Sequence, residues 1–543
     1  MRHVWLALLL APWNIAVCAA DVDIYVTDYT GKQIVGEERP LAGRKSTTAL
    51  LFASRGEYEP FSFALQPKER LTDVMIRATA LRSPSGTIPA DHVTVRSAEG
   101  GHGENRMLLE LGRSWDMPAW SKELFWVTIH VPEQTPAGLY RGRVIVSSGK
   151  NDVASLEVHL DVLPIRLSEP PFCIGFHYQW PGNLEVLRAT LRDMRQHGMT
   201  NVGPLYGFHI PIDDDDTSQL GTFIREYLAA GYTKPIMFAA PMNLTVSALT
   251  GYGPVDSKRF QQKYIEVMRK LDAETQKHDI PVIFSIGDEF TNKGIRGVQY
   301  AEKLARFVFE ELPEICVSSD MNGYREVMAM APYLNYAGFN NGWDGIDHHN
   351  RGRRLVNEQF IKQLVQQTGA IPYFVNTGKG RFPFGFFFWR MSEYGVAGKV
   401  EWFYNLGGSG GGRGSVVKLE GTKIIPTVDY ERSREGVDDL KYLCRLEELL
   451  ETARRDGRAR SEAAAAQELL DRIKASIIPN WTAYTSGGMK WPPERLDWLD
   501  RAKVERFGPY NAIRRTVADQ ILALREALET ETGERASGGS ERR

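Results

Sequence analysis

The dipeptide Asp288–Glu289 is the feature of this 543-residue sequence that most clearly indicates chemistry. It ends a largely apolar run, IFSIGDEF at residues 283–290, so both carboxyl groups are expected at the end of a buried strand. Enzymes that cleave glycosidic bonds commonly hold two carboxyl groups about 5 to 9 Å apart, one on each side of the bond. Adjacent residues seldom straddle a sugar in that way. The spacing therefore favours substrate-assisted catalysis, in which Glu289 is the acid and base and Asp288 orients a 2-acetamido group that attacks the anomeric carbon.

A second carboxylate, Glu401, offers an alternative mechanism. If Glu401 faced Glu289 across a pocket at about 5 Å, the two would form an ordinary retaining glycosidase with a covalent intermediate. In the segment KVEWFY, strand alternation places Glu401 and Phe403 on one face and Trp402 and Tyr404 on the other. The sequence does not decide which face lies inside, so Glu401 is either catalytic or part of a structural ion pair.

Further polar and aromatic residues follow other apolar runs and could line the same pocket. Sugars present apolar faces that stack on aromatic rings and hydroxyl groups that need hydrogen-bond donors and acceptors. Trp and Tyr beside amides and carboxylates therefore suit a carbohydrate. The candidate substrate-binding residues are His177, Tyr178, Tyr206, Asn243, Asp320, Asn340, Trp343, Asn376, Glu401, Trp402 and Tyr404.

These residues would meet if their segments were strands of one barrel. Apolar strand-like runs alternate with amphipathic helical stretches through the middle of the chain, which is typical of a (β/α)8 barrel, or TIM barrel. In such barrels the carboxyl ends of all strands meet at one mouth, where the chemistry occurs. The eight expected strands are 172–178, 200–206, 234–241, 281–289, 314–320, 334–340, 371–376 and 398–405.

The regions before and after the barrel have different patterns of apolar residues. Short alternating runs separated by Gly, Pro, Ser and Asn precede the barrel and predict a β-sandwich. Long stretches with apolar residues three and four apart follow it and predict helices. We therefore expect a multidomain β plus α/β protein, whose parts are a signal peptide at 1–20, a β-sandwich at 21–168, a TIM barrel at 172–426, a helical region at 427–532 and a disordered tail at 533–543.

Composition and sequence motifs limit the expected binding partners, the cofactors and the cellular location of the protein. Lys plus Arg number 66 against 68 Asp plus Glu, so no strong field attracts nucleic acid. Residues 1–20 have a basic start, an apolar run and small residues before Asp21, which predicts export to the periplasm or beyond the cell. No later run has 18 consecutive apolar residues, so no membrane span is expected. Zinc-type Cys/His spacing and glycine-rich phosphate loops of the Walker or dinucleotide kind are missing, so neither metal nor cofactor is expected. The sequence does not indicate an oligomeric state.

Five segments resemble the glycoside hydrolase family 123 β-N-acetylgalactosaminidases and related barrel proteins. They are RGEYEPFSFAL at 55–65, WVTIHVPEQTPAGLYRGRVIV at 126–146, the acidic pair at 288–289, GKVEWFYN at 398–405 and PTVDYERSREGVDDLKYL at 426–443. The resemblance implies that Asp288 orients the acetamido group, that Glu289 is the general acid and base, and that aromatic residues at the strand ends hold an N-acetyl sugar. Arg434, Glu435 and Asp439 of the last segment are expected to fasten the helical region to the barrel.

The leading hypothesis is therefore an exported glycoside hydrolase that releases a β-linked, GalNAc-like N-acetylhexosamine from an oligosaccharide, polysaccharide or glycoconjugate. Two alternatives remain. One is the two-carboxylate enzyme that uses Glu289 and Glu401. The other is a carbohydrate-binding protein without catalysis, which would keep the aromatic residues but would not need a protonatable Glu289.

Overall fold

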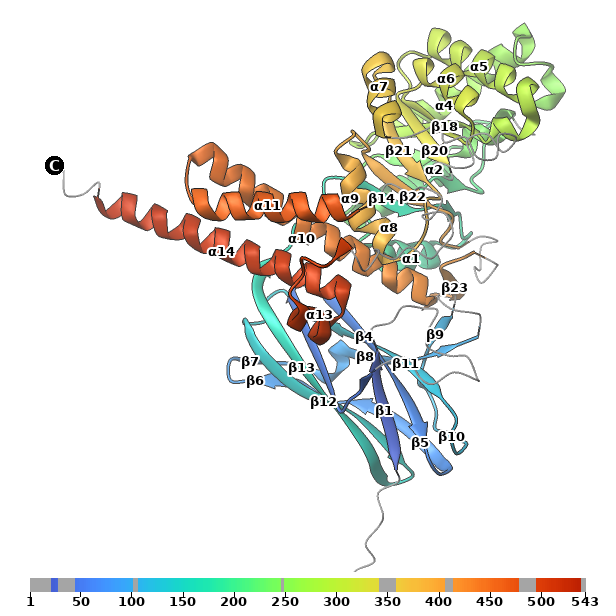
Figure 1. Cartoon of the computed structure of the whole chain (residues 1–543). Helices are drawn as coiled ribbons and strands as arrows, with labels where there is room; N and C mark the ends of the chain where they lie inside the picture. The colour runs from blue at the N-terminus through green and yellow to red at the C-terminus, as the bar shows by residue number, and fades with distance from the viewer. Residues whose placement is uncertain are drawn as a thin grey trace, which may run out of the picture.

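The structure is a computed structural model that describes residues 21–27, 44–100, 106–245, 249–340, 358–405, 414–477 and 495–538. It contains a two-sheet sandwich, a parallel barrel and a helical region (Figure 1). The predicted fold class is confirmed. The segment expected to be a signal peptide lies outside the described residues. Within the described residues, no helix combines the length and the apolar character that crossing a membrane requires.

The sandwich is built from two sheets that enclose their own apolar core. The first sheet contains, in spatial order, β2 (Arg44–Lys45), β1 (Val22–Thr27), β4 (Tyr58–Pro67), β11 (Glu123–His130), β8 (Val93–Glu99) and β9 (Met107–Glu110). The second contains β10 (Trp115–Met117), β5 (Leu71–Ala78), β12 (Gly138–Ser148), β13 (Asn151–Arg166) and β3 (Thr48–Arg55), with β6 (Leu81–Ser83) and β7 (Gly86–Ile88) beside β12. The antiparallel arrangement expected from the sequence has one exception, because β3 pairs with β13 in parallel.

The barrel is a sheet of parallel strands whose two ends belong to the same stretch of chain. The strands are β14 (Cys173–Phe176), β15 (Tyr178–Gln179), β16 (Leu205–Tyr206), β17 (Ile236–Phe238), β18 (Val282–Asp288), β19 (Val317–Met321), β20 (Tyr336–Asn340), β21 (Ile371–Val375) and β22 (Gly398–Glu401). β14 pairs with β22 and β15 with β16, so the first barrel strand is split at His177 and closes the circle. A small apolar cluster that includes Ile283, Val375 and Val400 fills the interior.

Helices cover the outside of the barrel, and their ends follow the expected capping chemistry. The side chain of Asn183 accepts hydrogen bonds from two backbone N–H groups at the start of α1, and Ser257 caps α4. The covering helices are α1 (Leu184–Gln196), α2 (Ser218–Ala229), α4 (Lys258–Thr275), α5 (Gly294–Glu311), α6 (Tyr324–Met330), α7 (Glu358–Thr368), α8 (Arg381–Phe384) and α9 (Phe386–Ser392).

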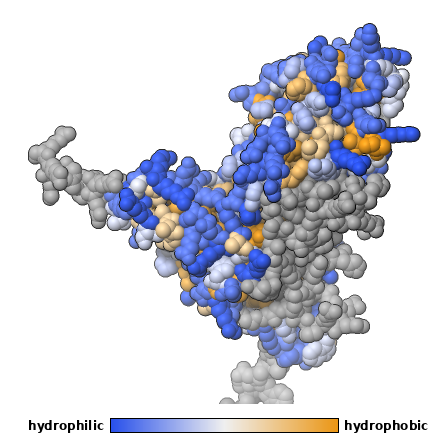
Figure 2. All heavy atoms as spheres, turned by 45° about the horizontal axis from the view of Figure 1, so that its top comes forward, coloured by the Kyte–Doolittle hydropathy of each residue, from blue (hydrophilic) through white to orange (hydrophobic). Residues whose placement is uncertain are grey.

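The helical region contains α10 (Val428–Asp456), α11 (Arg460–Ser476), α13 (Arg501–Phe507) and α14 (Pro509–Gly538). α11 and the end of α14 project away from the barrel, and the face of this arm seen in Figure 2 is mainly hydrophilic. Two features correct the sequence-based expectation. A hairpin of β23 (Val417–Glu420) and β24 (Lys423–Pro426) precedes α10. α14 also continues to Gly538, into the tail expected to be disordered, because Glu534, Arg535 and Ala536 are good helix formers.

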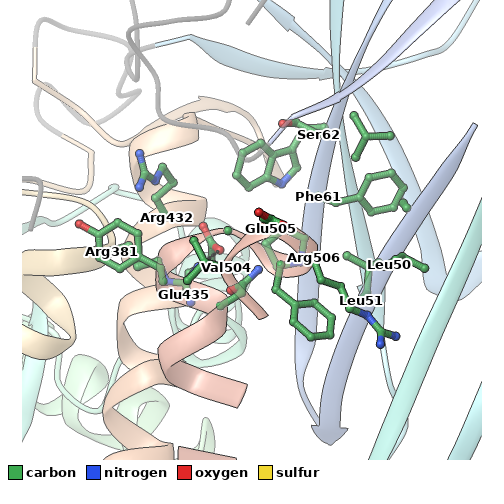
Figure 3. Close-up of a pocket in the computed structure, with 18 of the residues that line it drawn as sticks. Leu50, Leu51, Phe61, Ser62, Arg381, Arg432, Glu435, Val504, Glu505 and Arg506 are labelled. Carbon is green, nitrogen blue, oxygen red and sulfur yellow. Dashed lines mark hydrogen bonds and ion pairs between the residues drawn. The ribbon is translucent and has the colours of Figure 1, made fainter. Parts of the chain in front are cut away.

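Buried ion pairs fasten α10 to the other two parts. Arg381 of α8 donates to Asp439 at 2.6 and 2.8 Å and to Glu435 at 3.1 Å. Arg434 instead pairs with Glu431 and lies over the ring of Tyr58 in the sandwich. Two of the three predicted fastening residues therefore contact the barrel side and the third contacts the sandwich. Beside them lies a cavity of about 230 Å³, lined by Arg381, Glu435 and sandwich residues, at the domain junction rather than at the barrel mouth (Figure 3).

Candidate active site at the barrel mouth

The acidic pair occupies the turn that leaves β18. Glu289 has a φ of +48°, in the left-handed region, and is followed by the short 3-10 helix η5 (Phe290–Lys293). The buried Glu326 of α6 holds this turn by accepting hydrogen bonds from Phe290 N at 2.8 Å, Thr291 N at 3.2 Å and Thr291 Oγ1 at 2.8 Å. A left-handed backbone at a residue other than glycine costs about 1 kcal/mol or more. The anchored turn offsets this cost and fixes where the Glu289 side chain starts.

One amide nitrogen lies within reach of both carboxylates. Asn340 Nδ2 is 2.7 Å from Glu289 Oε1 and 3.5 Å from Asp288 Oδ1. Asn292 Nδ2 donates to the other oxygen of Glu289 at 2.7 Å. The two carboxyl groups therefore lie close together at the barrel mouth, within reach of the same donor.

The electrostatic setting favours a proton on Asp288. Burial, together with the charges of Asp320, Glu289 and Glu326, raises the pKa of Asp288 to about 8, and the hydrogen bond from Asn340 opposes this shift. Burial also raises the pKa of Asp320 to about 7, although Tyr373 donates a hydrogen bond to it. Near neutral pH, Asp288 is therefore close to its titration midpoint and responds to any change in its neighbours.

The rings of His177, Tyr206 and Trp402 form an aromatic wall beside the acidic pair. The His177 ring stacks on Tyr206 with centroids 5.6 Å apart, and His177 Nδ1 lies 3.0 Å from the Tyr206 hydroxyl. Trp402 meets both rings edge-on, at 5.2 and 5.7 Å, and is 37% exposed. Burial lowers the pKa of His177 to about 3, so the imidazole is neutral. Within the described residues its Nε2 has no hydrogen-bond partner. The exposed indole of Trp402 provides an apolar face on which a sugar ring can stack.

Asn376 joins the wall to the acidic pair. Its Oδ1 accepts from Trp402 N at 2.9 Å and its Nδ2 donates to Asn340 Oδ1 at 2.8 Å. The structure thus brings nine predicted residues to one end of the barrel. They are Asp288, Glu289, His177, Tyr206, Asn340, Asn376 and Trp402 at the mouth, Asp320 buried beneath them, and Asn243 by its backbone in α3 (Ala240–Asn243), which follows β17. Trp343 lies outside the described residues.

Tyr178 and Tyr404 are not at the mouth, contrary to expectation. The Tyr178 hydroxyl lies 2.7 Å from Thr190 Oγ1, and the Tyr404 hydroxyl donates to Asp193 at 2.8 Å, so both are buried against α1. Tyr178 follows the inward His177 and alternation turns it outward. For Tyr404 the alternation of β22 no longer applies, because that strand ends at Glu401.

Glu401 also points away from the barrel interior. Because Val400 lies in the barrel interior, its neighbours Lys399 and Glu401 point toward the helices. Glu401 Oε2 accepts from Lys399 Nζ at 2.8 Å and from Gly378 N at 3.0 Å. Of the two roles left open by the sequence, the geometry matches the structural ion pair.

Several residues of this region were missed by the sequence analysis. Asn292 donates to Glu289 and Tyr373 donates to Asp320, whereas Asn322 donates to Asn292 and Glu326 holds the turn after Glu289. Asn292 could have been noticed, because it lies three positions after Glu289 in the same turn. Nothing local distinguishes Glu326 from any other helical glutamate. In the described part of the chain, no group of three or more His, Cys, Asp or Glu residues is arranged to hold a metal ion.

Comparisons with known proteins identify a solved structure with the same architecture. The sequence matches no known family model and no curated protein. Among solved structures, a family 123 glycoside hydrolase from Clostridium perfringens, studied for glycolipid glycan hydrolysis, superposes with a TM-score of 0.63 at 13% identity, over 94% of this chain and 100% of that one. A family 39 glycoside hydrolase from Bacteroides cellulosilyticus WH2 gives 0.37 at 12% identity, over 72% of this chain and 81% of that one. The chain shares the fold of the Clostridium perfringens enzyme.

Proposed function

We propose that this protein is an exported glycoside hydrolase that releases a β-linked, GalNAc-like N-acetylhexosamine by substrate-assisted retaining catalysis. The observation that carries the proposal is the position of a single amide nitrogen, 2.7 Å from Glu289 and 3.5 Å from Asp288. Two carboxylates on one side of a sugar cannot serve as nucleophile and acid on opposite sides of its bond. This geometry is explained if the nucleophile is the acetamido group of the substrate itself.

The side chains have distinct roles in this mechanism. Glu289 donates a proton to the glycosidic oxygen as the bond to the anomeric carbon breaks. Asp288 accepts the N–H of the acetamido group, whose oxygen attacks the anomeric carbon and forms a cyclic oxazolinium. Glu289, now a carboxylate, takes a proton from water, which opens the ring from the original face. The product keeps its configuration, and no covalent bond to the protein forms.

Two further observations support the proposal. The exposed Trp402 indole suits the apolar face of a sugar ring. The fold shared with a family 123 enzyme studied for glycolipid glycan hydrolysis is compatible with membership of that family and with a glycoconjugate substrate. The mechanism that pairs Glu289 with Glu401 receives no such support, because Glu401 is bonded to Lys399 on the outside of the barrel.

The test is hydrolysis of aryl 2-acetamido-2-deoxy-β-galactosides and β-glucosides by the chain from residue 21 onward. We expect the N-acetylated substrates to be cleaved, a thiazoline mimic of the cyclic intermediate to inhibit, and Glu289→Gln to lose at least two orders of magnitude in rate. Glu185→Gln, an exposed glutamate in the first turn of α1, is the control. Efficient turnover of glycosides that lack the acetamido group would contradict the proposed mechanism. Binding of sugar without release by the unmodified protein would favour the non-catalytic alternative.

A further inference from the structure

Two chains of side-chain amides end on the two oxygens of Glu289. The first begins at the Trp402 backbone N–H, which donates to Asn376 Oδ1 at 2.9 Å. Asn376 Nδ2 then donates to Asn340 Oδ1 at 2.8 Å, and Asn340 Nδ2 donates to Glu289 Oε1 at 2.7 Å. This chain crosses the ends of β22, β21, β20 and β18, so it spans half of the barrel mouth.

The direction of this chain is fixed by its first member. A backbone N–H can only donate, so Asn376 must present its oxygen to Trp402 and its nitrogen to Asn340. Asn340 must then receive that donor with its oxygen and turn its own nitrogen to Glu289. Each amide has only one orientation that satisfies both neighbours, and that orientation always delivers a donor to the carboxylate.

A second chain reaches the other oxygen. Asn322 Nδ2 donates to Asn292 Oδ1 at 3.0 Å, and Asn292 Nδ2 donates to Glu289 Oε2 at 2.7 Å. Asn322 is fully buried, and its backbone N–H is held by Glu326 at 3.3 Å. Both oxygens of Glu289 therefore accept from amide N–H groups, and in the first chain the Trp402 N–H sets the orientation of those amides.

We propose that Asn376 and Asn322 are positioning residues that act on Glu289 through Asn340 and Asn292. The chains fix the rotation of the Glu289 carboxyl group, because each of its two oxygens accepts from a different amide N–H group. They thereby set the direction in which Glu289 presents its carboxyl group at the barrel mouth. The meaning for turnover rests on the proposed function, whereas the orientation of the Glu289 carboxyl group does not.

Asn376→Asp tests the first chain because it reverses the direction of the hydrogen bonds that lead to Glu289. Aspartate tolerates the left-handed φ of +56° at this position and still accepts from Trp402 N. Asn340 must then donate to Asp rather than accept, so it presents its oxygen to Glu289, where only a protonated Glu289 can bond it. We expect the alkaline limb of the kcat profile to move up by about 1 to 2 pH units. A pH-titrated infrared difference spectrum of the carboxyl band, assigned with Glu289→Gln, should show the same shift without any substrate.

Two controls separate an effect transmitted through the hydrogen-bonded amides, the relay, from a simple effect of added charge. Asn183→Asp adds one negative charge at the N-terminus of α1, where aspartate caps as well as asparagine does, and should leave the profile in place. In a background carrying Asn340→Ala the relay is cut, so adding Asn376→Asp should move the infrared titration by well under half of the original shift. Through-space repulsion would instead persist in that background.

Asn322→Asp tests the second chain and keeps the proposal testable if the first variant does not fold. It should turn Asn292 around in the same way and shift the Glu289 titration in the same direction. An infrared titration of Asn376→Asp and Asn322→Asp that coincides with Asn183→Asp would overturn the proposal, as would a full shift in the Asn340→Ala background. Failure of the unmodified protein to hydrolyse any N-acetylated glycoside would sink the proposed function only, since the infrared measurement decides the relay independently.

Discussion

At the scale of single residues, the charge state of Asp288 links the structure to activity. Its carboxyl group is mostly buried and lies near Asp320, Glu289 and Glu326, which together with burial raise its pKa to about 8. In the proposed mechanism Asp288 must be ionised to accept the amide N–H and to stabilise the positive ring. Activity should therefore rise with pH up to about that value.

Removal of the neighbouring charge that raises the pKa of Asp288 most should move this limit. Asp320→Asn takes away the neighbouring charge that contributes most to the shift, while its amide oxygen can still accept from Tyr373. The ionised form of Asp288 then becomes easier to reach, and the acidic limb of the kcat/KM profile should move down by about one pH unit. The profile is measured with an aryl N-acetylated glycoside. An unchanged acidic limb would show that Asp288 does not limit activity there.

The sequence could predict the acidic pair because a strand end gives adjacent residues a common location. It could not predict the partners that tune them. Asp320 was proposed as a ligand for hydroxyl groups, but it is 1% exposed and bonded to Tyr373. Asp320 acts on Asp288 across the barrel interior. The number of residues between two positions in the sequence does not indicate how close their side chains lie there.

At the scale of elements, β22 carries Glu401, the residue that distinguishes the two hydrolytic mechanisms considered for this chain. Its alternation was visible in the sequence, but the inward face was not. The structure places Val400 inside and the Lys399–Glu401 pair outside, where Lys399 also donates to Thr377 Oγ1 at 2.6 Å. Burial lowers the pKa of Lys399, so its charge depends on the carboxylate beside it.

Glu401→Gln should therefore act as a structural change rather than a catalytic one. We expect a loss of about 3 kcal/mol in the free energy of unfolding, as is usual when one partner of a buried pair is removed. The remaining folded protein should keep turnover within about tenfold, whereas removal of a covalent nucleophile costs several orders of magnitude. Denaturant unfolding and kcat are measured on the same preparation. A loss of about a thousandfold in kcat that added azide restores would instead identify Glu401 as the nucleophile.

The early end of β22 at Glu401 explains the other misplaced residue. Alternation assigned Trp402 and Tyr404 to one face, but only Trp402 reaches the mouth. Sequence periodicity applies only within a strand, and directly after β22 the Trp402 N–H donates to the side chain of Asn376, which follows β21.

At the scale of the whole molecule, buried charges join the sandwich, the barrel and the C-terminal helices. Arg514 of α14 donates to Glu57 at 3.2 Å and Glu59 at 3.0 Å in the sandwich, and to Asp439 of α10 at 2.6 Å. Asp439 in turn holds Arg381 of the barrel. The sequence indicated Glu435 and Asp439 as fastening residues, but it could not name Arg514, which lies 75 positions after Asp439, or Glu57 in the sandwich.

This network should make stability depend on pH. Burial raises the pKa of Glu57 from 4.5 to about 7 despite the charge of Arg514, so the folded protein holds a proton that the unfolded chain releases. The stabilisation from this proton is complete below about pH 4.5 and is lost as the pH rises through 7. Glu57→Gln, which cannot titrate, should show a smaller fall in Tm between pH 5 and 8 than the unmodified protein. Parallel Tm curves for the two proteins would contradict this assignment.

The central claim is that the reacting nucleophile comes from the substrate and that Asp288 and Glu289 serve it from one side. The most direct measurement is kcat for a series of aryl β-glycosides whose N-acetyl group carries progressively more fluorine atoms. Fluorine withdraws electrons from the amide oxygen, so the account predicts that kcat falls steeply and regularly along the series. A kcat that stays constant across the series would contradict it, because the amide would then take no part in breaking the bond.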